Sequence, residues 1–294
     1  MKSIQIFGHG APLVLVPGIQ GRWEYMRPTI DALAASFQVI TFPLCGEPAS
    51  GRRFEPGKGL DNFVEQLDAV LDECRVESAA ICGISFGGLI ALHYAAQRPE
   101  RASALILAST PGPAFQLRKR HQVYARVPLI FGPLFLAEMP RRVGHELTVV
   151  MPRRRDRLRF GWTQVRTFLG APVSASRMAE RATMLGAEML RDDCARVTAP
   201  TLVVTGEPAL DYVVPVGGTS EYATLIPGAR AARIDRTGHL GYITRPELFA
   251  TLVRTFILEN VSISRGDPTP ARAAGASPDG ALSRPGEGCS PHAA

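Results

Sequence analysis

Seven short runs of β-branched or aliphatic residues recur along the chain, and most are apolar throughout instead of alternating with polar residues. A strand has this pattern when both of its faces are covered, as in a parallel sheet flanked by helices. The pattern therefore predicts an α/β fold with a mostly parallel, doubly wound sheet. The runs are residues 3–7, 13–16, 38–41, 79–82, 104–108, 201–205 and 231–234.

Helical patterns lie between these runs. The clearest spans residues 60–73, where Phe63, Val64, Leu67, Val70 and Leu71 recur at helical spacing. Further helices are predicted over residues 28–36, directly after Ser85, and over residues 246–258. The first two apolar runs are close enough in sequence to open the sheet as a hairpin.

The alternation stops at Thr110 and resumes at Thr201. Between them the chain has helical patterns interrupted by Pro128, Pro133, Pro140, Pro152 and Pro172, without a convincing strand. We therefore predict an α/β core made of residues 1–110 and 198–260, with residues 111–197 inserted as a helical cap, or lid. Residues 261–294 are rich in Pro, Gly, Ala and Ser and predict a disordered tail.

Composition limits the cellular setting. The N-terminal apolar stretch is interrupted by glycine and proline, and no run approaches the ~18 apolar residues of a membrane span. The five cysteines are widely spaced and odd in number, which favours neither a disulfide framework nor a metal site. We expect a cytoplasmic protein without stable membrane insertion; the sequence leaves its oligomeric state open.

The net charge of +6 is unevenly distributed. Residues 111–197 hold sixteen Arg and Lys against seven Asp and Glu, most densely at 152–159. A solvated helix face is the favoured interpretation, and a patch for anionic lipid, acidic substrates or nucleic acid is the alternative. Because no aromatic residues interleave with these arginines as stacking platforms, we expect no nucleic-acid partner.

One motif points to chemistry. Residues 83–88 read GISFGG, between the apolar run at 79–82 and a helical pattern. A serine at a tight strand-to-helix turn is exposed on a strained backbone, and the flanking Gly83 and Gly87 suit such a turn. Ser85 is thus a candidate nucleophile, although a glycine-rich connection without chemistry has the same pattern.

A nucleophilic serine needs a base and an acid from neighbouring strand ends. His239 follows the last apolar run, in a loop at the carboxyl edge of the sheet, where sites of open α/β sheets lie. Asp211 is the first candidate acid because it lies deep in the loop after residues 201–205. Glu207, one step past that strand, is the alternative, and Asp235 is a weaker third candidate.

Developing negative charge on a substrate oxygen needs backbone donors. The N–H of Phe86, directly after the serine, is one candidate. The N–H of Ile19 in the loop Val16–Gly21 is the second, with Gly18 allowing close approach. Trp23, just past this loop, is either a residue of the substrate pocket or an ordinary packed aromatic.

With these motifs in the order Ser, Asp, His, the chain resembles the α/β-hydrolase superfamily, as a capped carboxylesterase-like serine hydrolase, over residues 3–260. The resemblance implies a triad of Ser85, His239 and Asp211, an oxyanion hole from Ile19 and Phe86, and a lid that shapes the pocket. Two features depart from the family pattern. Pro17-Gly18 replaces the usual His-Gly, and four residues separate Gly206 from Asp211, which is longer than the common spacing.

The expected activity is hydrolysis of a small-molecule carboxylic ester through an acyl-enzyme, with no cofactor or metal. A serine at position 85 argues against relatives that use an aspartate there. Thioesterase, lactonase, C–C bond hydrolase, cofactor-free haloperoxidase and acyltransferase chemistry all stay open. The alternatives outside this set are a non-catalytic relative that binds a small ligand and a lipase steered to membranes by its arginine-rich cap.

Overall fold

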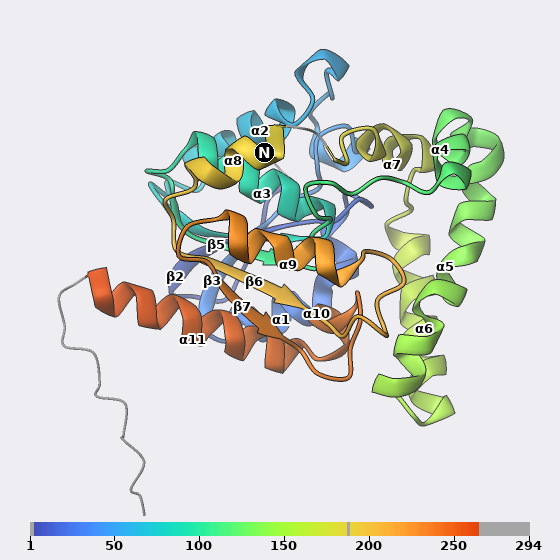
Figure 1. The fold of residues 1–294 in the computed structure, drawn as a ribbon. Helices are drawn as coiled ribbons and strands as arrows, with labels where there is room; N and C mark the ends of the chain where they lie inside the picture. The colour runs from blue at the N-terminus through green and yellow to red at the C-terminus, as the bar shows by residue number, and fades with distance from the viewer. Residues whose placement is uncertain (1–2, 187–188, 265–294) are drawn as a thin grey trace, which may run out of the picture.

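A seven-stranded sheet runs through the middle of the molecule in the order β1-β3-β2-β4-β5-β6-β7 (Figure 1). The computed structural model describes residues 3–186 and 189–264. All neighbouring strands are parallel except β1 and β3, so the predicted mostly parallel sheet is confirmed. The strands are β1 (Gln5–Phe7), β2 (Ala11–Val16), β3 (Phe37–Thr41), β4 (Ala79–Ile84), β5 (Ala102–Ala108), β6 (Thr201–Thr205) and β7 (Arg230–Arg233).

The predicted hairpin of the first two strands is wrong. Strand β1 pairs antiparallel with β3, with Gln5 opposite Thr41, while β2 is paired in parallel with both β3 and β4. No edge of β2 is therefore free for β1. The intervening turn contains Gly8 at φ +73°, where a side chain would collide with the carbonyl oxygens of Ala34 and Phe37. The turn therefore packs closely against the segment that leads into β3, and this position places β1 beside β3.

Two helical layers cover the sheet (Figure 1). On one face pack α2 (Asp61–Glu73), α3 (Phe86–Gln97), α8 (Met189–Arg196) and α9 (Val216–Leu225), and on the other α1 (Arg27–Ala34) and α11 (Pro246–Ser264). The remaining short helices are α10 (Gly241–Thr244), η1 (Trp23–Met26), η2 (Pro48–Ser50) and η3 (Pro56–Lys58). The predicted helices α1, α2, α3 and α11 are confirmed. Helix α9 was not predicted, because its sequence VGGTSEYATL holds two glycines and little apolar periodicity.

Four helices between β5 and α8 stand together at one side of the molecule (Figure 1). We call α4 to α7 the helical insertion: α4 (Lys119–Arg126), α5 (Pro128–Val150), α6 (Arg154–Gly170) and α7 (Ala175–Ala182). Pro133 and Pro140 do not break the chain as predicted, since α5 runs through both. Pro140 is exposed, so water can bond to the carbonyl group left without its helical partner.

The C-terminal region is described only in part. Residues 261–264 of the predicted tail form the end of α11, and residues 265–294 lie outside the described residues. Among the helices of residues 3–186 and 189–264, none combines the length and apolar character that crossing a membrane requires.

Candidate active site

Ser85 occupies the sharp turn between β4 and α3. Its φ of 53° and ψ of −121° lie in a region that residues other than glycine rarely adopt. The turn is held from both sides, because the Ser85 N–H donates to the Ala108 carbonyl at 2.8 Å and the Gly88 N–H donates to the Ser85 carbonyl at 2.8 Å. Ser85 is partly exposed although both of its neighbours are buried. The strained turn thus presents one hydroxyl to solvent.

The glycines flanking Ser85 are required by close packing. A side chain at Gly83 would collide with the backbone of Gly87, and one at Gly87 would collide with the carbonyl oxygens of Val16 and Pro17. The start of α3 therefore lies directly against the end of β2 and the loop that follows it. This agrees with the role given to the two glycines from the sequence.

The loop after β2 passes beside Ser85. A Cβ atom at Gly18 would lie 3.6 Å from the Ser85 Cβ. The loop is closed by a 2.9 Å hydrogen bond from the Gly21 N–H to the Gly18 carbonyl. Ile19 and Phe86 line the same cavity as Ser85. The structure thus brings together the three residues whose backbone and hydroxyl groups were assigned to one reaction centre.

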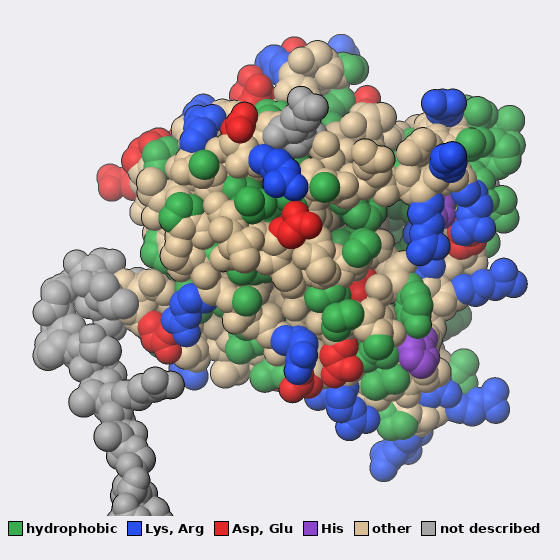
Figure 2. All heavy atoms as spheres, in the orientation of Figure 1, with side chains coloured by type: hydrophobic (Ala, Val, Ile, Leu, Met, Phe, Trp, Pro, Cys, Tyr) green, Lys and Arg blue, Asp and Glu red, His purple; other side chains and the backbone are tan. Residues whose placement is uncertain are grey.

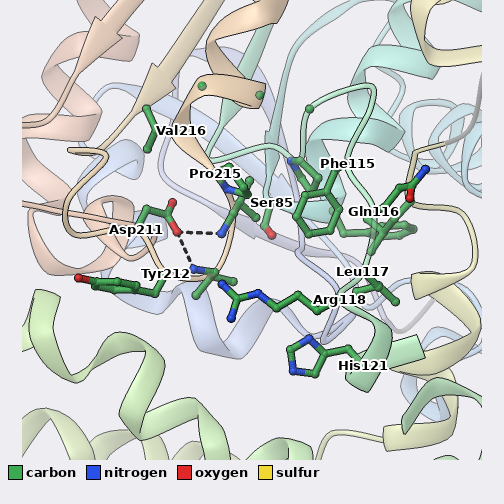
Figure 3. Close-up of a pocket in the computed structure, with 18 of the residues that line it drawn as sticks. Ser85, Phe115, Gln116, Leu117, Arg118, His121, Asp211, Tyr212, Pro215 and Val216 are labelled. Atoms are coloured by element: carbon green, nitrogen blue, oxygen red, sulfur yellow. Dashed lines mark hydrogen bonds between the residues drawn. The ribbon is translucent and has the colours of Figure 1, made fainter. Parts of the chain in front are cut away.

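His239 and Asp211 face each other from the loops after β7 and β6. The His239 Nδ1 lies 3.3 Å from the Asp211 Oδ2, and both side chains are almost fully buried. The other carboxylate oxygen, Oδ1, accepts the backbone N–H groups of Val213 at 2.9 Å and Val214 at 2.8 Å, as the dashed lines in Figure 3 mark. These two bonds fix the carboxylate and aim its second oxygen at the imidazole.

The other two carboxylate candidates point elsewhere. Glu207 accepts the backbone N–H of Arg236 at 2.6 Å, and Asp235 is exposed and pairs with Arg233 at 2.9 Å. Among the described residues, no hydrogen bond joins the Ser85 hydroxyl to the His239 ring. Such bonds are often long in structures without substrate and tighten when substrate binds.

Ser85 opens onto a cavity of about 670 Å³. Its walls come from the loop after β5, the loop that holds Asp211, the start of α9 and the helical insertion (Figure 3). Trp23, a candidate for this pocket, is not among its lining residues. It lies in η1 and packs against the Phe7 ring, with centroids 5.7 Å apart, beside the core on the α1 face of the sheet. The pocket assignment of Trp23 is therefore corrected.

A family model for the alpha/beta hydrolase fold matches residues 11–246. The chain belongs to this family. The α/β-hydrolase fold predicted from the sequence is thereby confirmed.

Similar proteins include several hydrolases. A putative carbamate hydrolase, RutD, of Azorhizobium caulinodans is 29% identical over 86% of this chain and 93% of its own length. A pimeloyl-[acyl-carrier protein] methyl ester esterase of Nitrosomonas europaea is 25% identical over 85% of this chain and 98% of its own. The crystal structure of the enol-lactonase from Burkholderia xenovorans LB400 superposes with a TM-score of 0.71 at 21% identity, covering 87% of this chain and 96% of that one. The structural likeness supports the fold.

Sequence reasoning missed a carboxylate of the α/β hydrolase that lies beside His239. Glu146 of α5 is 1% exposed, and both of its carboxylate oxygens accept the Leu240 N–H, at 3.0 and 3.1 Å. Burial raises the pKa of Glu146 and the negative charge of Asp211 adds to this effect, while backbone donors at Gly238 and Leu240 and the His239 ring oppose it. The helical insertion is thus bonded to the histidine loop through this glutamate. The sequence does not indicate a role for Glu146, because the residue belongs to no recognisable motif within α5.

No group of three or more His, Cys, Asp or Glu side chains among residues 3–186 and 189–264 is arranged to hold a metal ion. The groups that the structure gathers at this site are a hydroxyl, an imidazole, a carboxylate and backbone N–H groups. That set can transfer an acyl group between oxygen atoms.

Proposed function

We propose that this protein hydrolyses carboxylic esters through an acyl-enzyme on Ser85. The observation that carries the proposal is the strained, partly exposed Ser85 turn at the wall of a 670 Å³ cavity. The buried His239–Asp211 contact lies at the same edge of the sheet. Membership of the α/β-hydrolase family and the hydrolase relatives support it.

In the proposed reaction, the Ser85 oxygen attacks the ester carbonyl carbon as His239 takes the hydroxyl proton. Asp211 orients the ring and stabilises the imidazolium that forms. The N–H groups of Ile19 and Phe86 bind the oxyanion of the tetrahedral intermediate. When the carbon–oxygen bond to the alcohol breaks, His239 gives its proton to the leaving oxygen. Water, deprotonated by His239, then attacks the acyl carbon, and Ser85 recovers its proton as the acid is released.

The decisive test is Ser85→Ala, assayed on short p-nitrophenyl esters. We expect kcat/KM to fall by at least roughly 10³-fold, because the variant cannot form the acyl-enzyme. Ser50→Ala is the matched control, since Ser50 is a buried serine whose hydroxyl bonds to backbone groups of Glu47 and Arg52. Full turnover by Ser85→Ala would overturn the proposal.

Active-site labelling separates an enzyme from a relative that only binds a ligand. A fluorophosphonate probe should modify Ser85 in the wild type and leave both Ser85→Ala and His239→Ala unlabelled, because reaction needs the activated hydroxyl. A panel of esters, thioesters and lactones of matched acyl length then ranks the remaining serine-hydrolase chemistries. The proposal predicts the highest kcat/KM on oxygen esters.

A further inference from the structure

Two arginines line the same cavity as Ser85. Arg118 precedes the first turn of α4, and Arg142 lies within α5. Figure 3 shows the Arg118 side chain extended across the cavity, between Ser85 and His121 in this view. A second hollow of about 310 Å³ shares Arg118, Arg142 and Tyr212 with the first and adds Arg120, Arg141 and one acid, Glu138. The cavity therefore adjoins a strongly basic surface, seen as Lys and Arg side chains gathered over α4 and α5 in Figure 2.

These two arginines have no acidic partner in the part of the chain that the structure describes. No carboxylate there lies within ion-pair distance of either guanidinium. Glu138, which lines the adjoining hollow, is bonded to Arg120 at 2.9 Å and to the Tyr124 hydroxyl at 3.3 Å. Neither guanidinium that faces the cavity is therefore held in an ion pair, although the carboxylates of Asp211 and Glu221 line the same cavity.

Arg142 is nevertheless held in a defined position. Its guanidinium carbon lies 5.4 Å from the centre of the Phe135 ring, and its Nη2 lies 3.1 Å from the His121 Nδ1. Burial lowers the pKa of Arg142, the charges of Arg118 and Arg120 add to this effect, and the charge of Glu138 opposes it. Burial, with Arg142 adding to it, also lowers the pKa of His121, which favours the neutral ring that can accept a hydrogen bond. A braced guanidinium crowded by like charges is stabilised when an anion binds.

The rest of the cavity is mostly apolar, although Gln116, Asp211 and Glu221 also line it. Its walls include Phe86, Leu117, Leu185, Val213 and Val216. A ligand that fills the space between Ser85 and the arginines therefore needs an apolar segment followed by an anionic group. The dense arginine run at 152–159 does not contribute positive charge to the cavity wall, since none of its residues lines the cavity.

We propose that Arg118 and Arg142 form an anion-binding subsite of the cavity. The preferred substrates are esters whose acyl or alcohol chain carries a carboxylate or a phosphate beyond an apolar segment. Arg142 supplies a preset, stacked guanidinium, and the exposed Arg118 closes over the anion from the loop before α4. The nature of the cleaved bond rests on the proposed function, whereas the subsite is defined by the two arginines.

Matched ester pairs test the subsite kinetically. Mono-p-nitrophenyl adipate carries a free carboxylate, and methyl p-nitrophenyl adipate is its neutral analogue. We expect Arg118→Gln and Arg142→Gln each to lower the ratio of the two kcat/KM values, anionic over neutral, by about 10- to 100-fold, the range of a charge-assisted hydrogen bond. Arg126→Gln is the control with the same charge change, because Arg126 is an exposed α4 arginine that lines none of the hollows described. Its ratio should equal that of the wild type.

Binding to Ser85→Ala tests the subsite without turnover. Calorimetry should find monomethyl adipate bound at least tenfold more tightly than dimethyl adipate, and Arg118→Gln in the same background should remove that preference. Monohexyl phosphate, measured in parallel, distinguishes a phosphate from a carboxylate as the better anion. Added salt should weaken binding of both anions more than that of the diester.

The outcomes separate the two proposals. If neither p-nitrophenyl ester is cleaved, the proposed function fails and the binding experiment alone decides the subsite. If the esters are cleaved but the anionic-over-neutral ratio is the same in the wild type, Arg118→Gln and Arg142→Gln, the subsite is wrong. An equal fall in Arg126→Gln would also overturn it, because the effect would then come from overall charge. Arg118 is exposed, so its variant tests the proposal even if Arg142→Gln does not fold.

Discussion

The guanidinium of Arg181, in α7, donates a 3.0 Å hydrogen bond to the carbonyl oxygen of Ile19. The same side chain pairs with Glu47 at 2.7 Å and donates to the Cys45 carbonyl at 3.3 Å. It also packs against Gly21, whose φ of +70° and lack of a side chain leave room for it. One buried guanidinium thus joins the helical insertion both to Glu47, through an ion pair, and to the loop that carries a proposed oxyanion donor, through a hydrogen bond.

We expect Arg181→Met to be destabilising and nearly inactive. Removing one partner leaves Glu47 charged and buried, which costs about 3–5 kcal/mol in the free energy of unfolding. The double variant Arg181→Met, Glu47→Leu removes both charges and should recover most of that stability. Its kcat should stay about 10- to 100-fold below wild type, because the Ile19 loop has lost its anchor.

Urea unfolding and ester hydrolysis, measured on the same preparations, check this prediction. Arg177→Met, on the same helix and outside the ion pair, is the control and should change both quantities little. Wild-type activity in a stably folded double variant would show that Arg181 acts on stability alone.

Substitutions of Asp211 and Glu207 should have different effects on activity. Asp211→Asn keeps an oxygen for the Val213 and Val214 N–H groups but takes the charge from beside His239, so kcat should fall roughly 10³- to 10⁴-fold. Glu207→Gln should leave kcat within a few-fold, since Glu207 bonds to the Arg236 backbone. Steady-state kinetics on one p-nitrophenyl ester compares the two. A larger loss of kcat in Glu207→Gln than in Asp211→Asn would mean that Glu207, not Asp211, is the carboxylate that acts with His239.

The features predicted from the sequence are those that depend on local pattern. Buried parallel strands are apolar throughout, and the Ser85 turn demands glycine at fixed positions, so both are visible in a single chain. The pairing of β1 was missed because it depends on which strand edge the completed sheet leaves free. No local pattern contains that information.

The site residues that the sequence did not predict were missed for one physical reason. Arg181, Glu146, Arg118 and Arg142 lie outside any motif and acquire their roles only through contacts with distant loops. The charge pattern instead drew attention to residues 152–159, which are dense in arginine but lie away from the cavity. Trp23 follows the Ile19 loop in sequence, which places it near the site, yet in η1 it packs with Phe7 beside the core on the α1 face of the sheet.

The buried Glu146 should make stability fall as pH rises. Its pKa is raised by burial, so the folded protein holds the proton more firmly than the unfolded chain. Its contribution is fully present below the unfolded pKa, near 4.3, and is lost as pH rises through the higher folded value. Glu146→Gln keeps an acceptor for the Leu240 N–H and removes the titration. Relative to this variant, the wild type should lose stability as pH rises above about 4.3 and through the raised folded pKa of Glu146.

Chemical denaturation at a series of pH values measures the difference in unfolding free energy between the wild type and Glu146→Gln. Glu180→Gln, which makes the same substitution at a less buried glutamate on α7, is the control. A difference that grows in favour of the wild type with rising pH would contradict the assigned shift.

His93 should produce a second pH dependence, at higher pH. It lies on α3, with Nδ1 2.7 Å from Asp193 of α8 and Nε2 3.0 Å from Asp61 of α2. Burial lowers the pKa of His93, but the hydrogen bonds and charges of Asp193 and Asp61 outweigh it, and the net pKa is raised. The stabilisation is therefore fully present below the unfolded pKa of about 6.5 and is lost as pH rises through the folded value.

His93→Gln tests this ion-pair network. The variant removes the cation that pairs with the buried Asp193 carboxylate, which then keeps only the Arg196 guanidinium, at 3.8 Å. The free energy of unfolding should therefore fall by about 3–5 kcal/mol near pH 6, where the wild-type imidazolium is formed. The cost should become smaller as pH rises through the folded pKa of His93, because the wild type loses the same charge by titration. Urea unfolding at pH 6, 7, 8 and 9 measures this trend. A cost that is constant over this range would mean that His93 stabilises the contact between α3 and α8 as a neutral ring.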